Sequence, residues 1–330
     1  MSIFVSIASY RDNSCINTIK SLFENAKDPT RVFIGICQQN NHKIDKDCSY
    51  DKYKNNIRII RIPYYDAKGP VYARYLCACL LENEDYFLQI DSHTVFTKNW
   101  DDICISMINE IKKLGLSTKP VISYYPKDVN QIDHCYETND TIPVIKGVDY
   151  VNGVLSLKQA VYMTIDNKNP YMKTPYITGN FFFCESYFLK EFHYDPTLDY
   201  LFQGEEILYS IKFYTYGWDA FCPNTNIVYH EYIRSNKPKY WDEPRINFNN
   251  KKALKKIRFY LFNYDDNKTD PYYFNYRLGK QRTIQDFYKF ANIDINLYKN
   301  NFKITPKLLI LFIVLFLFIL FALVFYLKYL

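Results

Sequence analysis

Residues 86–93 read Tyr-Phe-Leu-Gln-Ile-Asp-Ser-His, a short apolar run that ends in three polar residues. An apolar run of this length, entered from the acidic turn Glu84-Asp85, predicts a strand that is buried on both faces. In open α/β sheets the ligand crevice lies at the carboxyl ends of the strands. We therefore expect residues 91–93 to stand at a binding site.

The sequence on either side of this strand alternates between apolar runs and helical spacing. Further strands are predicted over 3–9, 32–37 and 57–62, and helices over 16–26, 71–81 and 100–114. This alternation indicates a parallel α/β sheet. The loop after Ser9 would then meet the loop after Ile90 at one edge of that sheet. Beyond about residue 120 the runs shorten and prolines recur, which predicts a loop-rich second half, with a basic amphipathic helix over 247–263.

Composition favours a folded protein whose partners are not nucleic acids. The chain has 330 residues, of which 48% are hydrophobic, enough for one substantial core. Its formal net charge of +6 comes from Lys and Arg residues interleaved with Asp and Glu. Because no long basic stripe results, nucleic acid is not an expected partner.

Residues 308–327 are all apolar or aromatic. About 20 such residues cross the roughly 30 Å hydrocarbon layer as a helix, whereas a core helix that is apolar on every face is rare at the end of a chain. Lys299, Lys303 and Lys307 precede this run and only Lys328 follows it, while the N-terminus carries no secretory signal. The sequence therefore predicts a single-pass C-terminal membrane anchor, with the rest of the chain on the cytoplasmic side.

Asp91 and His93 form a candidate metal site. Standing two residues apart at a strand end, their side chains can leave the backbone on the same side and reach one ion. A carboxylate and an imidazole suit a borderline divalent ion such as manganese. A strand-end Asp also serves as a cap and a neighbouring His as its hydrogen-bonded companion, so the triplet alone leaves both interpretations open.

Other charged residues have a functional and an ordinary interpretation. Glu205 and Glu206 follow Gly204 at a predicted helix start, where the helix dipole favours carboxylates whether or not they face a cleft. Arg11 and Arg74 each carry a guanidinium that could hold a phosphate in a bidentate manner or form a structural ion pair. The residues alone do not separate these alternatives.

Three blocks of sequence resemble glycosyltransferases of the A-type fold, in particular the polypeptide N-acetylgalactosaminyltransferases. Residues 69–74 and 84–93 resemble their metal-site region, which has a helix with Ala-Arg, an acidic turn, an apolar strand and Asp-Ser-His. Residues 179–183, 194–199 and 204–206 look like their acceptor-side motif. Residues 216–230 are similar to the stretch that ends in their third metal ligand, and with the first strand the resemblance covers roughly residues 1–235.

The first strand, with Ile-Ala-Ser-Tyr-Arg-Asp at 7–12, most resembles cytosolic protein-hydroxyproline N-acetylglucosaminyltransferases. This resemblance implies an α/β, Rossmann-like GT-A fold and a manganese-dependent, retaining transfer of N-acetylglucosamine from UDP-GlcNAc to a protein hydroxyl, with hydroxyproline as the expected acceptor. Two alternatives remain: a UDP-galactose or UDP-glucose transferase with another hydroxyl acceptor, and a non-catalytic, membrane-tethered protein that binds a sugar nucleotide.

The resemblance also implies roles for individual residues. The expected metal ligands are Asp91, His93 and His230, and the expected catalytic residues are Glu205 and Glu206, with a carboxylate nucleophile and same-face attack both open. The residues expected to bind the nucleotide or substrate are Ser9, Arg11, Arg74, Ser92, Gly179 and Asn180. The expected domains are a catalytic domain at 1–245, a helical extension at 246–307 and the membrane helix at 308–327.

Overall fold

The computed structural model describes residues 1–132, 141–166, 168, 170–235, 237–242, 251–263 and 276–299. The chain divides into two compact units, Met1–Ile293 and Asp294–Leu330. The described part of the second unit contains helix α10 (Ile295–Lys299). All other elements belong to the first unit, which continues past residue 245, where we expected the catalytic domain to end.

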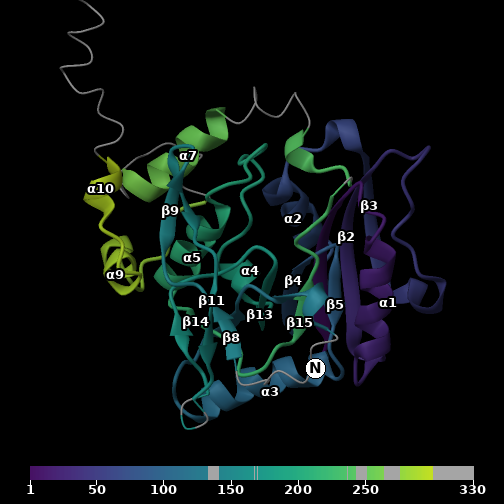
Figure 1. Ribbon diagram of the computed structural model, residues 1–330, viewed down its shortest axis with the longest axis horizontal. Coiled ribbons are helices and arrows are strands. Elements are labelled where there is room, and N and C mark those ends of the chain that lie inside the picture. The colour runs from purple at the N-terminus through teal and green to yellow at the C-terminus, as the bar shows by residue number, and fades with distance from the viewer. Residues whose placement is uncertain are drawn as a thin grey trace, which may run out of the picture. The chain divides into compact units, whose positions relative to one another are not determined.

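An eight-stranded sheet forms the centre of the first unit, in the order β12-β14-β6-β13-β4-β1-β2-β3 (Figure 1). Its strands are β1 (Ile3–Tyr10), β2 (Val32–Asn40), β3 (Ile57–Pro63), β4 (Tyr86–Asp91), β6 (Pro120–Ser123), β12 (Lys173–Thr174), β13 (Phe181–Glu185) and β14 (Asp219–Phe221). The four strands that the sequence predicts are therefore confirmed, and they lie next to one another.

The sheet is mixed rather than wholly parallel, which corrects the expectation from the sequence. Strands β1 to β4 are parallel, with Ala8 opposite Asp91, but β13 runs antiparallel between β4 and β6. The chain enters β13 at the carboxyl edge of β4, where Phe181 pairs with Ile90. A strand entered from that edge must run in the opposite direction.

Helices cover both faces of the sheet, because successive side chains of a strand point to opposite faces. Along β1, Ile3, Val5 and Ile7 pack in the core that holds helices α1 and α3, whereas Phe4 packs in the core that holds α4 and α5. The helices of the first unit are α1 (Cys15–Asn25), α2 (Pro70–Ala78), α3 (Trp100–Lys113), α4 (Phe188–Glu191), α5 (Glu205–Thr215), α7 (Lys251–Phe262) and α9 (Ile284–Phe290).

Two helices differ from their predicted bounds. Helix α2 ends at Ala78 rather than at residue 81, because the chain tightens beyond Ala78. The backbone N–H groups of Leu80 and Leu81 donate to the carbonyl oxygens three residues earlier, Cys77 and Ala78, as in a 3-10 turn. The predicted basic helix is observed as α7 from Lys251, and residues 243–250 lie outside the described part of the chain. Helices α7 and α9 both pack against α5, which adds them to the same compact unit.

Three small sheets complete the first unit. They pair β5 (Thr94–Phe96) and β7 (Lys127–Asp128) with β15 (Val228–His230), β8 (Thr141–Val144) with β11 (Val161–Thr164), and β9 (Val148–Val151) with β10 (Val154–Leu157). Among the described residues no helix is long and apolar enough to cross a membrane. The predicted span at 308–327 lies outside those residues and stays a prediction.

Close packing around β2 predicts the effect of adding a single methyl group at Gly35. A Cβ at Gly35 in β2 would overlap the Phe4 ring and lie 3.1 Å from the Cys77 carbonyl oxygen. We expect Gly35→Ala to lower the free energy of unfolding by about 1–3 kcal/mol, measured by urea denaturation. The matched control is Gly147→Ala, whose Cβ would have Lys158 Cδ as its nearest contact at 3.7 Å. Equal stability of the two variants would contradict this account of the packing.

Candidate functional site

A cavity of about 470 Å³ opens at the carboxyl edge of the sheet. Its wall comes from the ends of β1 and β4, the turn before β13, the start of α5 and the segment after β15. The predicted site residues on this wall are Arg74, Asp91, Ser92, His93, Gly179, Asn180, Glu205, Glu206 and His230. The structure thus brings together residues that the sequence separates by more than a hundred positions.

Strand β15 carries His230 to the end of β4. In the three-stranded sheet, His230 pairs with Thr94 of β5, and the backbone N–H of Glu231 donates to the carbonyl oxygen of His93 at 3.1 Å. The short strand β5 begins immediately after His93, so this pairing fixes the two histidines on adjacent backbone segments. Their ring centroids lie 4.6 Å apart.

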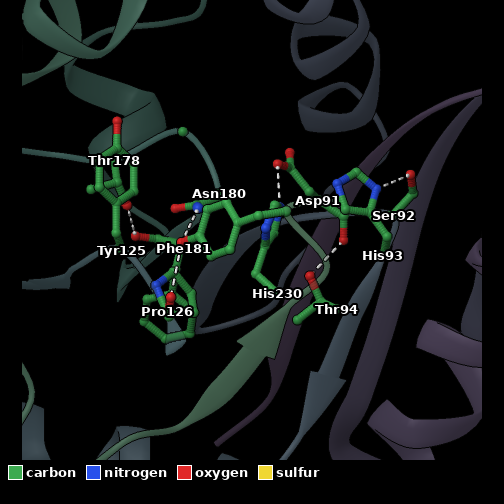
Figure 2. Close-up of polar contacts among 12 residues, drawn as sticks. Asp91, Ser92, His93, Thr94, Tyr125, Pro126, Thr178, Asn180, Phe181 and His230 are labelled. Carbon is green, nitrogen blue, oxygen red and sulfur yellow. Dashed lines mark hydrogen bonds and ion pairs between the residues drawn. The ribbon is translucent and has the colours of Figure 1, made fainter. Parts of the chain in front are cut away.

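Asp91, His93 and His230 form a group that fits one divalent ion. Each residue offers one ligand atom, and these atoms lie within 4.8 Å of one another (Figure 2). His230 Nε2 lies 3.1 Å from Asp91 Oδ2, while the buried His230 Nδ1 has no hydrogen-bond partner among the described residues. One carboxylate and two imidazoles are a donor set for borderline divalent ions.

The charge state of Asp91 is also suited to this task. Burial by itself would raise the pKa of Asp91, but His230 and Arg74 outweigh burial and hold that pKa well below its usual range. An ionised carboxylate is the form that binds a metal ion. Asp91 is therefore ready to bind a cation at neutral pH.

Arg74 of α2 links Asp91 to the start of α5. Its NH1 donates to Glu205 Oε1, its NH2 lies 3.3 Å from Asp91 Oδ1, and the same NH2 donates to the Gly179 carbonyl oxygen at 2.8 Å. The guanidinium is buried. Of the two interpretations of Arg74, the structure shows the ion pair, and that ion pair forms part of the cavity wall.

The two glutamates at the start of α5 have different environments. Glu206 accepts hydrogen bonds from the Tyr125 hydroxyl at 2.8 and 3.0 Å and from the Gly179 N–H at 2.8 Å. Glu205 pairs with Arg74 through Oε1, and its buried Oε2 has no hydrogen-bond partner among the described residues. Burial raises the pKa of Glu205, and burial raises the pKa of Glu206 to about 7.

Two predicted nucleotide-binding residues do not lie on the cavity wall. Ser9 is buried beneath the edge, with its Oγ 3.7 Å from Cys48 Sγ. Arg11 Nε donates to Asp45 Oδ2 at 3.1 Å, and its guanidinium lies 4.6 Å from the Tyr64 ring centroid. Their proposed contact with a nucleotide stays a prediction.

Sequence reasoning missed three residues of the site: Asp12, Tyr125 and Arg234. Asp12 follows β1 and is fully buried, with His93 Nδ1 and Arg234 NH2 at 2.8 and 3.2 Å from its Oδ2. Burial opposes ionisation of Asp12, but these partners lower its pKa to about 2. Asp12 and Tyr125 each follow a strand that ends at the same edge, a signal the sequence offers, whereas nothing in the sequence singles out Arg234.

A series of hydrogen bonds extends from the site through Asn180 and Tyr232. Asn180 Nδ2 donates to the Tyr232 hydroxyl at 3.3 Å, and that hydroxyl donates to the Pro126 carbonyl oxygen at 2.8 Å. Figure 2 shows Asn180 and Pro126 beside Tyr125, next to the metal-binding group. The turn before β13 is therefore tied to the segments that follow both β6 and β15.

The raised pKa of Glu206 predicts how stability changes with pH. Between about pH 4.5 and about pH 7 the folded state keeps the proton of Glu206 while the unfolded state loses it, so stability falls as the pH rises. We expect the free energy of unfolding of the wild type to fall by about 3 kcal/mol relative to Glu206→Gln across this window. Urea denaturation at a series of pH values measures the difference, in which the groups that titrate independently of Glu206 cancel. Parallel curves for the two proteins would contradict the assignment.

The fold is shared with solved glycosyltransferase structures. A crystal structure of GalNAc-T7 with UDP, GalNAc and Mn²⁺ superposes with a TM-score of 0.55 at 14% identity, over 92% of this chain and 56% of that chain. A crystal structure of residues 1–349 of S. aureus TarS in complex with UDP-GlcNAc gives 0.49 at 15% identity, over 80% of this chain and 67% of that one. The mixed α/β fold with its central sheet, shared with the GalNAc-T7 structure, matches the A-type glycosyltransferase fold that we expected. The chain spans little more than half the length of the GalNAc-T7 chain.

Comparison of sequences identifies the family. No curated protein matches the chain. The model of the family described as Glycosyltransferase (GlcNAc) matches residues 2–56 and 48–297, which include the whole cavity wall. The chain therefore belongs to the GlcNAc glycosyltransferase family.

Proposed function

We propose that the protein transfers N-acetylglucosamine from UDP-GlcNAc to a protein hydroxyl, with retention of the anomeric configuration and with Mn²⁺ held by Asp91, His93 and His230. The observation that carries this proposal is the placement of their ligand atoms within 4.8 Å of one another on the wall of the cavity. The family description names GlcNAc, and the GalNAc-T7 structure was solved with UDP, GalNAc and Mn²⁺. A cavity of this size suits a small-molecule ligand.

The cavity wall combines the metal-binding group with a cation suited to a diphosphate. A divalent ion bound there would offset the negative charge of a departing diphosphate. Arg234 also lines the cavity, and its buried Nε makes no hydrogen bond among the described residues. A guanidinium with free donors binds phosphate oxygens through charge-assisted hydrogen bonds. We assign Arg234 to the diphosphate of the donor.

Of the two glutamates, Glu205 is the one with a carboxylate oxygen left for substrate. Both oxygens of Glu206 accept from Tyr125, so Glu206 serves to hold the turn at Gly179. Glu205 lines the same cavity, and its buried Oε2 has no hydrogen-bond partner among the described residues. We therefore assign Glu205 Oε2 the contact with a hydroxyl of the donor sugar or of the acceptor.

Hydroxyproline is the first acceptor to test, because the segment at 7–12 resembles hydroxyproline N-acetylglucosaminyltransferases. The test incubates the protein with Mn²⁺, a panel of UDP-sugars and a hydroxyproline peptide, and measures release of UDP. We expect release with UDP-GlcNAc, loss of release with a chelator, and recovery when Mn²⁺ is restored. Release with UDP-galactose or UDP-glucose instead would identify the rival donor. Binding of UDP without release from any donor would favour the non-catalytic alternative.

Replacing one of the proposed metal ligands tests the metal site, and replacing a histidine away from the cavity serves as the control. We expect His230→Ala to reduce UDP release to the background rate, because two ligands remain where three hold the ion. The control is His42→Ala, since His42 is exposed and lies off the cavity wall. Turnover by a folded His230→Ala protein at the wild-type rate would overturn the metal assignment.

We further propose that residues 308–327 anchor the protein in a membrane as a single-pass helix, with the catalytic domain in the cytoplasm. The support is the unbroken apolar run and the lysines that precede it. We expect the full chain to remain in the membrane pellet after alkaline carbonate washing, and a chain that ends at Lys307 to be released. Release of both chains would overturn the anchor.

A further inference from the structure

We propose that Asp12 is a positioning residue of the metal site, which holds His93 in the tautomer whose Nε2 lone pair faces the ion. This inference rests on the proposed metal site and adds a residue to it. Asp12 follows β1, whereas His93 follows β4, the strand paired with β1. The sheet therefore brings the two side chains to the same edge.

The hydrogen bonds of Asp12 determine which ring nitrogen of His93 carries the proton. His93 Nδ1 lies 2.8 Å from Asp12 Oδ2. The backbone N–H of Ser14, the Ser92 hydroxyl and the Arg234 guanidinium all face the Asp12 carboxylate as donors, so the carboxylate accepts and Nδ1 carries the proton of this bond. In the neutral imidazole the other ring nitrogen, Nε2, then keeps its lone pair. A carboxylate or carbonyl behind a metal-binding histidine fixes both the tautomer and the orientation of the ring.

Asp12 is itself held rigidly. Its Oδ2 also accepts from the Ser92 hydroxyl at 2.7 Å, and its Oδ1 accepts from the backbone N–H of Ser14 at 3.0 Å. Arg234 NH2 lies 3.2 Å from Oδ2 and supplies a compensating positive charge. Because these groups occupy both of its oxygens, Asp12 acts through His93 rather than as a further ligand.

The other metal-binding histidine lacks such a partner. His230 Nδ1 is buried and makes no hydrogen bond among the described residues, and its Nε2 lies 3.1 Å from the ligand Asp91. The strand pairing of His230 with Thr94 positions its backbone, but no carboxylate stands behind its ring in the described part of the chain. His93 is therefore the ligand whose tautomer depends on a particular second residue.

The first experiment measures the affinity of the full chain for Mn²⁺ from the electron paramagnetic resonance signal of the free ion. We expect Asp12→Asn to weaken Mn²⁺ binding about 10-fold or more, because a neutral amide holds the imidazole less firmly. The matched control is Asp101→Asn. Asp101 lies at the start of α3 and is equally buried. It accepts hydrogen bonds from two backbone N–H groups and from the Arg31 guanidinium. We expect Asp101→Asn to bind Mn²⁺ as the wild type does.

A second measurement needs no variant of Asp12 and so holds even if that variant fails to fold. Nuclear magnetic resonance of the metal-free full chain labelled with ¹⁵N-histidine reports the tautomer of each ring, and His93→Gln identifies the signal of His93. We expect His93 to carry its proton on Nδ1. A neutral ring with its proton on Nε2 and none on Nδ1 would overturn the inference.

The outcomes also separate this inference from the proposed function. If the wild type binds no Mn²⁺, the metal site itself is overturned. If the wild type binds Mn²⁺ and folded Asp12→Asn binds it equally well, the metal site stands and the role of Asp12 is overturned. Weaker binding in Asp12→Asn but not in Asp101→Asn supports the role, since a general loss of stability would affect both variants.

Discussion

The ion pairs of Arg74 are the interaction on which the rest of the site depends. One buried guanidinium contacts Glu205 of α5, Asp91 of β4 and the carbonyl oxygen of Gly179. Removing one partner of a buried ion pair is costly, because it leaves a charge without compensation. Against burial, His230 and then Arg74 hold the pKa of Asp91 well below its usual range, so Asp91 remains ionised and available to a cation. The same contact fixes the start of α5 relative to β4, the strand that ends at Asp91.

The space around Arg74 explains the glycine that faces it. A Cβ at Gly179 would lie 3.2 Å from both NH1 and NH2 of Arg74 and 3.4 Å from Glu205 Oε1. A side chain there would push against the ion pair from the side of the turn before β13. Gly179 also donates its N–H to Glu206. The turn, the helix start and the buried guanidinium therefore form one rigid unit beside the cavity.

Two kinds of pairing bring the metal-binding group together. The central sheet places the ends of β1 and β4 side by side, and with them Asp12 and the Asp91-Ser92-His93 segment. The small sheet then returns the chain through β15, so that His230 lies opposite Thr94. Backbone hydrogen bonds determine both placements, and side-chain contacts such as that between Asp12 and His93 refine them.

The sequence by itself determined the first strands and helices, the strand that ends at Asp91, and the helix that starts at Glu205, because these depend on local apolar periodicity and on the residues that begin or end an element. It also supplied the candidate ligands Asp91 and His93 through their spacing at a strand end, and His230 through a resemblance. It did not reveal that β13 runs antiparallel, since strand direction depends on the edge at which the chain enters the sheet. Only the tertiary structure separated Glu205 from Glu206, because their different surroundings come from Arg74 and Tyr125, which lie far away in the sequence. For the same reason only the tertiary structure placed Asp12 behind His93 and Arg234 on the cavity wall.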